Sequence, residues 1–227
     1  ILAAEQRLVA AAGRTDGMVA DPATVDVALL ECTANGVELN AGQVALVRQL
    51  ASSGARVQVA IAPAGSGKTT AMRALSIAWA EAGGSVVGLA PSAAAASALG
   101  DQIDTHTDTL AKLTWSIDHD ELPAWAAAIG PKTLVVIDEA GMADTLSLDA
   151  AISFVLQRGG SVRLIGDDQQ LAAIGAGGVL RDITSRHGAA RLNELVRFAD
   201  PCSGSEGQRP RTLGVVALAP PACRRAD

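Results

Sequence analysis

The residues best suited to chemistry lie in the segment Ala62–Thr69, which has the sequence APAGSGKT. It fits the phosphate-binding pattern GxxxxGK[ST], except that alanine stands at the first glycine position. Gly65 and Gly67 allow successive backbone N–H groups to turn inward around phosphate oxygens. Lys68 would reach the β- and γ-phosphates, and the Thr69 hydroxyl would bind Mg²⁺. The pattern predicts a site for a magnesium nucleotide, and the alternative is an ordinary glycine-rich turn.

Polar residues also follow two hydrophobic strands further along the chain. Leu134–Ile137 is followed by Asp138, placed to hold Mg²⁺ through water, and by Glu139, placed to deprotonate the attacking water. The alternative is a solvated acidic strand end. Val162–Ile165 is followed by Gly166–Leu171, where a polar amide can sense the γ-phosphate, although a plain Gly-Asp turn is the simpler interpretation.

These groups need a parallel sheet to bring them together, because strand carboxyl ends meet at one edge of such a sheet. Continuous apolar runs typical of strands buried on both faces alternate with helical segments, which predicts an α/β doubly wound fold. The expected strands are 57–61, 86–90, 134–137 and 162–165. The expected helices are 1–12, 24–32, one that carries Val44 to Leu50, 70–82 and 93–99.

Composition excludes several classes of protein. The chain has 227 residues, of which 49% are hydrophobic, so it is not disordered or collagen-like. Its three cysteines lack disulfide-scaffold or zinc spacing, and no apolar run approaches the roughly 20 residues that span a bilayer. No signal peptide is apparent, so we expect a cytoplasmic protein without a membrane partner. The net charge of −6 means that nucleic acid could be bound only through a local patch.

The ordered motifs resemble those of superfamily 1 DNA helicases. The similarity is closest to the RecD-like motor, as in MobF-type conjugative relaxase-helicases (the TraI and TrwC kind), and covers about residues 1–200. The segments that carry it are Leu39–Gln43, Ala62–Thr69, Ala90–Ala93, Asp138–Met142, Gly166–Leu171 and Gly177–Gly178. The resemblance implies a RecA-like P-loop NTPase sheet with helices on both faces.

The resemblance also implies the cofactors ATP and Mg²⁺ and assigns roles to residues. It implies that Gln43 reads the adenine, that Gln170 couples the γ-phosphate to DNA, and that Arg197 contacts the γ-phosphate; for Gln43 and Arg197 the alternative is a helix-surface position. Single-stranded DNA would run along Ala90–Ala93. The implied catalytic residues are Lys68, Glu139, Gln170 and Arg197, and the implied metal ligands are Thr69 and Asp138. The implied nucleotide-binding residues are Gln43, Ala64, Gly65, Ser66, Gly67, Lys68, Thr69 and Thr70.

The chain also departs from the family pattern. We expect a helical lead-in at 1–35, a RecA-like ATPase domain at 36–200, and a poorly structured tail at 201–227 that resembles a shifted reading frame. A second RecA-like domain, the natural partner of such a motor, is expected to be missing by truncation. The predicted function is the ATP-hydrolysing core of a DNA helicase acting on single-stranded DNA, with no other small-molecule substrate. The alternative is a nucleotide-binding remnant without helicase activity, which single-stranded DNA would not stimulate.

Overall fold

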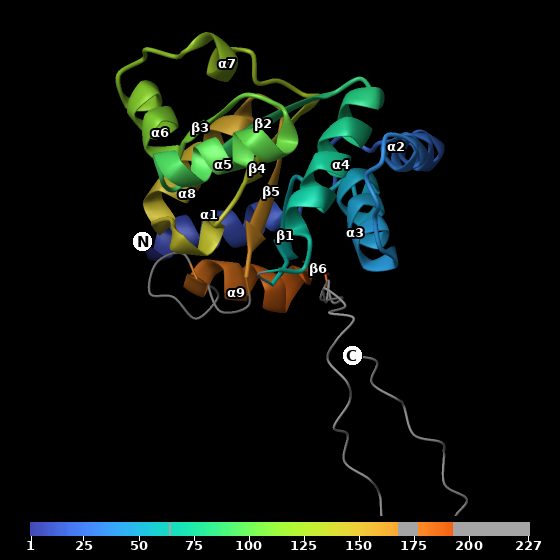
Figure 1. The fold of residues 1–227 in the computed structure, drawn as a ribbon. Helices are drawn as coiled ribbons and strands as arrows, with labels where there is room; N and C mark the ends of the chain where they lie inside the picture. The colour runs from blue at the N-terminus through green and yellow to red at the C-terminus, as the bar shows by residue number, and fades with distance from the viewer. Residues whose placement is uncertain (64, 168–176, 193–227) are drawn as a thin grey trace, which may run out of the picture. The chain divides into compact units, whose positions relative to one another are not determined.

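The computed structural model describes residues 1–63, 65–167 and 177–192 (Figure 1). In these residues, six strands form one parallel sheet in the order β3-β2-β4-β5-β1-β6. The strands are β1 (Val57–Ile61), β2 (Ser85–Ala90), β3 (Thr107–Thr109), β4 (Thr133–Ile137), β5 (Ser161–Gly166) and β6 (Ala190–Arg191).

The central strands are the ones that sequence predicts. Every residue of β4 and β5 is buried, as the continuous aliphatic runs indicate, and the four expected strands are confirmed. The two strands at the edges were not predicted. β3 consists of the three polar residues TDT and β6 of only two residues, so neither has a hydrophobic pattern to detect.

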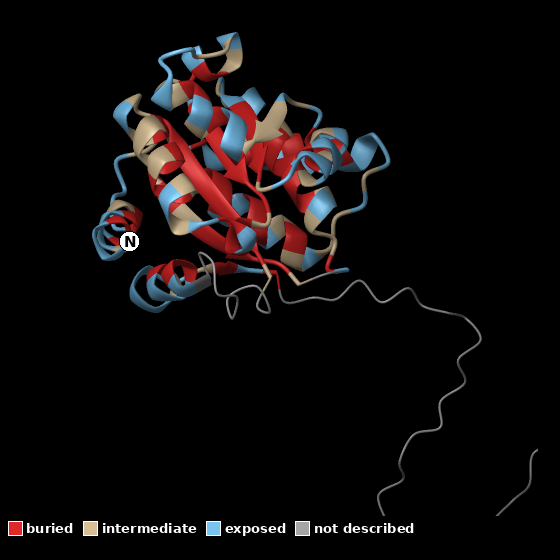
Figure 2. Cartoon of the chain, turned by 90° about the vertical axis from the view of Figure 1, so that its left-hand side faces the viewer, coloured by how far each residue is buried: buried red, intermediate tan, exposed pale blue. Residues whose placement is uncertain are grey.

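Helices cover both faces of the sheet, and Figure 2 shows the buried strands between them. On one face, α1 (Leu2–Ala12), α6 (Leu110–Asp118), α8 (Thr145–Gln157) and α9 (Gly177–His187) pack around the apolar side chains of β1, β4 and β5. On the other, α2 (Pro22–Ala34), α3 (Ala41–Ser52), α4 (Lys68–Glu81) and α5 (Ala93–Ile103) pack together. The short helices α7 (Ala124–Ala127) and η1 (Ala140–Met142) lie in connections.

The described residues all belong to one compact unit. Its core includes the predicted lead-in at 1–35, because α1 and α2 contribute buried side chains to opposite faces of the sheet. The fold is therefore the predicted parallel α/β sheet with helices on both faces. The predicted tail at 201–227 lies outside the described residues. None of the described helices is long and apolar enough to cross a membrane.

Candidate nucleotide site

The loop between β1 and α4 has the backbone that its glycines predict. Gly65 has a φ of 75° and Gly67 a φ of 81°, both in the left-handed region that glycine adopts without steric cost. The backbone N–H of Ser66 donates to the carbonyl of Pro63 at 3.1 Å and closes the turn. Ala64 lies outside the described residues.

Helix α4 begins without a side-chain cap, unlike the helices around it. Its N-cap residue is Gly67, which has no side chain to accept from the first-turn N–H groups. Side chains cap α2, α3, α5, α6 and α8, namely Asp21, Asn40, Ser92, Thr109 and Asp144. The Ser66 hydroxyl is also buried without a hydrogen-bond partner among the described residues. Free N–H groups, a helix dipole and a spare hydroxyl together fit an anionic phosphate.

Lys68 and Asp138 meet at the carboxyl edge of the sheet. The Lys68 ammonium lies 2.7 Å and 3.1 Å from the two carboxylate oxygens of Asp138. The two residues are adjacent because β1 and β4 both pair with β5, so the ends of the strands lie close together. The structure therefore joins the predicted phosphate-binding lysine to the predicted metal-binding carboxylate. Thr69, the other predicted metal ligand, follows Lys68 on α4 and is exposed.

Glu139 is held differently from Asp138. Its backbone has a φ of 51°, in the left-handed region that costs a non-glycine residue roughly 1–2 kcal/mol. Its N–H donates to the Asp138 carboxylate at 2.9 Å. Within the described residues the Glu139 carboxylate has no hydrogen bond or ion pair. Backbone strain of this kind is concentrated at functional sites.

Gln43 makes a contact that the sequence analysis did not predict. It is buried, and its side-chain amide donates to the Gly67 carbonyl at 2.9 Å. Its amide oxygen accepts from the Asn40 N–H while the Asn40 side chain accepts from the Gln43 N–H, both at 2.8 Å. This reciprocal arrangement is a capping box, and the spacing Asn-x-x-Gln at a helix start could have revealed it. Gln43 thus ties α3 to the phosphate loop, and its contact with adenine stays a prediction.

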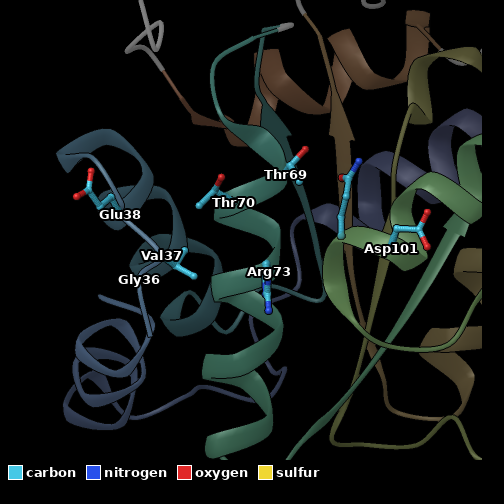
Figure 3. A pocket seen from close by; sticks show the side chains of 8 residues that line it. Gly36, Val37, Glu38, Thr69, Thr70, Arg73 and Asp101 are labelled. Atoms are coloured by element: carbon cyan, nitrogen blue, oxygen red, sulfur yellow. The ribbon is translucent and has the colours of Figure 1, made fainter. Parts of the chain in front are cut away.

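A cavity of about 370 Å³ lies beside the first two turns of α4. Figure 3 shows Thr70 and Arg73 on α4, with Glu38 on one side and Asp101 on the other. The cavity is lined by Gly36, Val37, Glu38, Thr69, Thr70, Arg73, Asp101 and Gln102. The side-chain oxygen of Gln102 is buried without a hydrogen-bond partner in the described residues. No sequence motif predicts this cavity, because its walls come from three segments that lie far apart in the chain.

The remaining predicted positions are only partly described. Gly166 ends β5 opposite Ile61, and its carbonyl accepts from the Ala62 N–H at 2.9 Å, so this segment does reach the phosphate loop. Ala90 ends β2, and Ser92 caps α5. Gln170 and Arg197 lie outside the described residues, and their roles stay predictions.

Comparison with known proteins gives the family. A family model described as an AAA domain matches residues 38–209. The chain belongs to this AAA-domain family. Its AAA domain is similar to the conjugal transfer protein TraA of Agrobacterium fabrum (strain C58 / ATCC 33970), with 35% identity over 145 residues, 63% of this chain and 12% of that protein. A probable conjugal transfer protein TraA of Sinorhizobium fredii (strain NBRC 101917 / NGR234) is also 35% identical over 144 residues, covering the same shares.

The chain therefore spans about 12% of the length of these relatives. Among solved structures, the UvsW helicase from bacteriophage T4 aligns with a TM-score of 0.46 and 13% identity, over 68% of this chain and 59% of that chain. The AAA-domain match and the conjugal transfer relatives confirm the resemblance of the chain to a RecD-like helicase motor.

Proposed function

We propose that this AAA domain binds ATP with Mg²⁺ and hydrolyses it as the motor core of a DNA helicase. The observation that carries the proposal is the Lys68–Asp138 pair beside the uncapped N-terminus of α4. A lysine and a carboxylate at this edge supply the two charges that a magnesium–triphosphate needs, one for phosphate and one for metal.

Each residue then has a distinct role. Lys68 would leave Asp138 to contact the β- and γ-phosphates, and Thr69 and Asp138 would hold the metal. Bound Mg²⁺ neutralises charge that develops on the phosphates. The Glu139 carboxylate, which has no hydrogen bond or ion pair within the described residues, accepts a proton from the attacking water. Gln170 senses the γ-phosphate, and Arg197 adds positive charge to it.

We propose that the cavity beside α4 receives the base and ribose. It adjoins Thr69 and Thr70 at the start of α4, and it offers as a hydrogen-bond acceptor the side-chain oxygen of Gln102, which has no partner in the described part of the chain. Gln43 contributes at the loop itself, where its side-chain amide donates to the Gly67 carbonyl.

We further infer a role in conjugal transfer from the TraA relatives. The motor would belong to a MobF-type relaxase-helicase, work in the cytoplasm, act on single-stranded DNA, and require a second RecA-like domain as its partner. The alternative is a domain that binds nucleotide without helicase activity, and stimulation of ATP hydrolysis by single-stranded DNA distinguishes the two.

The test begins with nucleotide binding by calorimetry. Lys68→Ala should abolish detectable binding of Mg²⁺-ATP, because it removes the cation that faces the phosphates. Lys132→Ala is the matched control, since the Lys132 side chain is exposed and makes no ion pair within the described residues. Glu139→Gln should bind nucleotide normally but release phosphate about 10²- to 10⁴-fold more slowly. Equal affinity in Lys68→Ala and the wild type would refute the site.

A further inference from the structure

An exposed aromatic and basic stripe runs along helix α6. Trp115 is 46% exposed, and the His119 ring stacks on it with centroids 4.2 Å apart and planes 19° from parallel. The Lys112 ammonium lies over the Trp115 ring, 5.6 Å from its centroid. The His119 Nδ1–H donates to the Trp115 carbonyl at 2.9 Å, which fixes the stacked ring. We call Lys112, Trp115 and His119 the α6 stripe.

Trp115 is the one exposed Trp or Phe among the described residues. Trp79 is fully buried, and its ring N–H donates to the Lys132 carbonyl. Trp125 stacks on His106, and Phe154 is half-buried under the Arg158 guanidinium. What sets Trp115 apart is its surroundings, because the exposed ring lies between a lysine and a stacked histidine.

The stripe starts near the edge of the sheet that carries the nucleotide site. Helix α6 follows β3 without a gap, and Thr109, the last residue of β3, lies opposite Ala90 at the end of β2. The Thr109 side chain caps the helix by accepting from the Lys112 N–H at 3.1 Å. Lys112 and the positive end of the α6 dipole therefore lie beside the segment Ala90–Ala93.

We propose that the α6 stripe binds single-stranded nucleic acid, with a base stacked on Trp115 and a phosphate contacted by Lys112. This inference rests on the proposed function on single-stranded DNA, and it names the residues that would bind the strand. An aromatic ring beside a cation is the chemistry that binds unpaired bases without sequence preference. The flexible Lys112 side chain can move from the ring to a phosphate as the base arrives.

Nearby acidic residues limit the path of the strand. Asp118, Asp120 and Glu121 are exposed at the C-terminal end of α6, where they would repel phosphates. The nucleic acid should therefore approach from the N-terminal end of the helix, from Ala90–Ala93 toward Trp115. Removing these charges, as in Asp118→Asn with Asp120→Asn, should tighten binding.

Intrinsic fluorescence tests the stacking directly. An oligothymidylate of about 12 nucleotides, within the usual site sizes for such proteins, should quench the fluorescence of the wild-type chain. Trp115→Ala should lose this quenching and bind the labelled oligomer about 5- to 150-fold more weakly, the loss expected for one stacked base. Trp125→Phe is the matched control, and it should retain both the fluorescence quenching and the affinity for the oligomer. Lys112→Ala should reduce the salt slope of binding by about 0.7.

Two further measurements separate this proposal from the nucleotide site. Trp115→Ala should bind Mg²⁺-ATP normally and keep its urea midpoint, and Lys68→Ala should still be quenched by the oligomer. Wild-type oligomer affinity in Trp115→Ala would overturn the proposal, as would the absence of any binding by the wild-type chain at about 10⁻⁴ M. Dissociation of a self-associated form by Trp115→Ala, with oligomer binding unchanged, would make the stripe a protein contact instead.

Discussion

At the scale of single residues, the Lys68–Asp138 ion pair means that a bound nucleotide would compete with Asp138 for Lys68. A bound phosphate would draw Lys68 away from Asp138, whose side chain is only 12% exposed and would be left as a poorly solvated charge. A bound Mg²⁺ would give that carboxylate a new partner. Nucleotide affinity should therefore depend on the metal for two reasons, its charge on the phosphates and its contact with Asp138.

The first prediction concerns removal of the metal. Chelating Mg²⁺ should weaken ATP binding to the wild type by about tenfold more than it weakens binding to Asp138→Asn, because the amide needs no counter-ion. Calorimetry with and without chelator measures both ratios, and Asp149→Asn serves as a control at an acid remote from the loop. The same metal dependence in wild type and Asp138→Asn would contradict this competition.

Spacing alone predicts a phosphate-binding loop, because the glycines and the lysine lie within eight consecutive positions. It does not predict what those residues touch. The Gln43–Gly67 contact joins segments 24 residues apart, and the cavity beside Arg73 is closed by Asp101 and Gln102 from another helix. Such contacts depend on how elements pack, which no local pattern encodes.

At the scale of elements, helix α8 is held at its start by a titrating cap. Asp144 accepts from the Ser147 N–H at 2.8 Å. Hydrogen bonds from the Ser147 side chain and then from its backbone lower the pKa of Asp144 below its usual value. The ionised cap therefore contributes stability above the unfolded pKa of about 4, and that contribution is lost as pH falls through the lower folded pKa.

The second prediction follows from this sign. At pH 7 the free energy of unfolding should be higher for the wild type than for Asp144→Ala, and the difference should shrink as the pH falls below about 4. Asp144→Asn should cap the helix without this pH dependence. Urea titrations at several pH values measure it, and a constant wild-type advantage down to pH 2 would contradict the assignment.

Strand β5 shows where sequence is informative about an element and where it is not. Its aliphatic run predicts burial, yet Arg163 lies in that run and is itself fully buried. Burial lowers the pKa of Arg163 to about 9, so the guanidinium is still charged at neutral pH. It donates to the carbonyls of Leu50 and Ala55 and so fastens the end of α3 to the sheet. A charged residue inside a buried strand indicates that hydrogen-bond partners surround it, but the sequence does not identify the residues that supply them.

At the scale of the whole compact unit, α1 is part of the core. Leu8 is 2% exposed among the helices and strands of one face, whereas Leu2 on the same helix is 70% exposed. Arg7 also forms an ion pair with Asp149 of α8. The sequence predicts this helix but not its place, because its helical partners α8 and α9 lie more than 130 residues further along the chain.

The third prediction uses the two leucines as a matched pair. Leu8→Ala should lower the free energy of unfolding by about 2–5 kcal/mol, the usual cost of a cavity at a buried leucine. Leu2→Ala should change it by less than about 0.5 kcal/mol. Urea denaturation measures both, and a neutral Leu8→Ala would show that α1 is not packed as described.

The position of β1 between β5 and β6 also affects how the chain is completed during synthesis. Both neighbours of β1 are made much later, since β5 begins at Ser161, 100 residues after β1 ends at Ile61. At about 5–20 residues per second, the emerging β1 waits roughly 5 to 20 s for its first partner. The phosphate loop at its end thus takes its final geometry among the last features of the unit. A nucleotide bound at this loop would therefore stabilise a nearly finished chain and would not guide the earlier stages of folding on the ribosome.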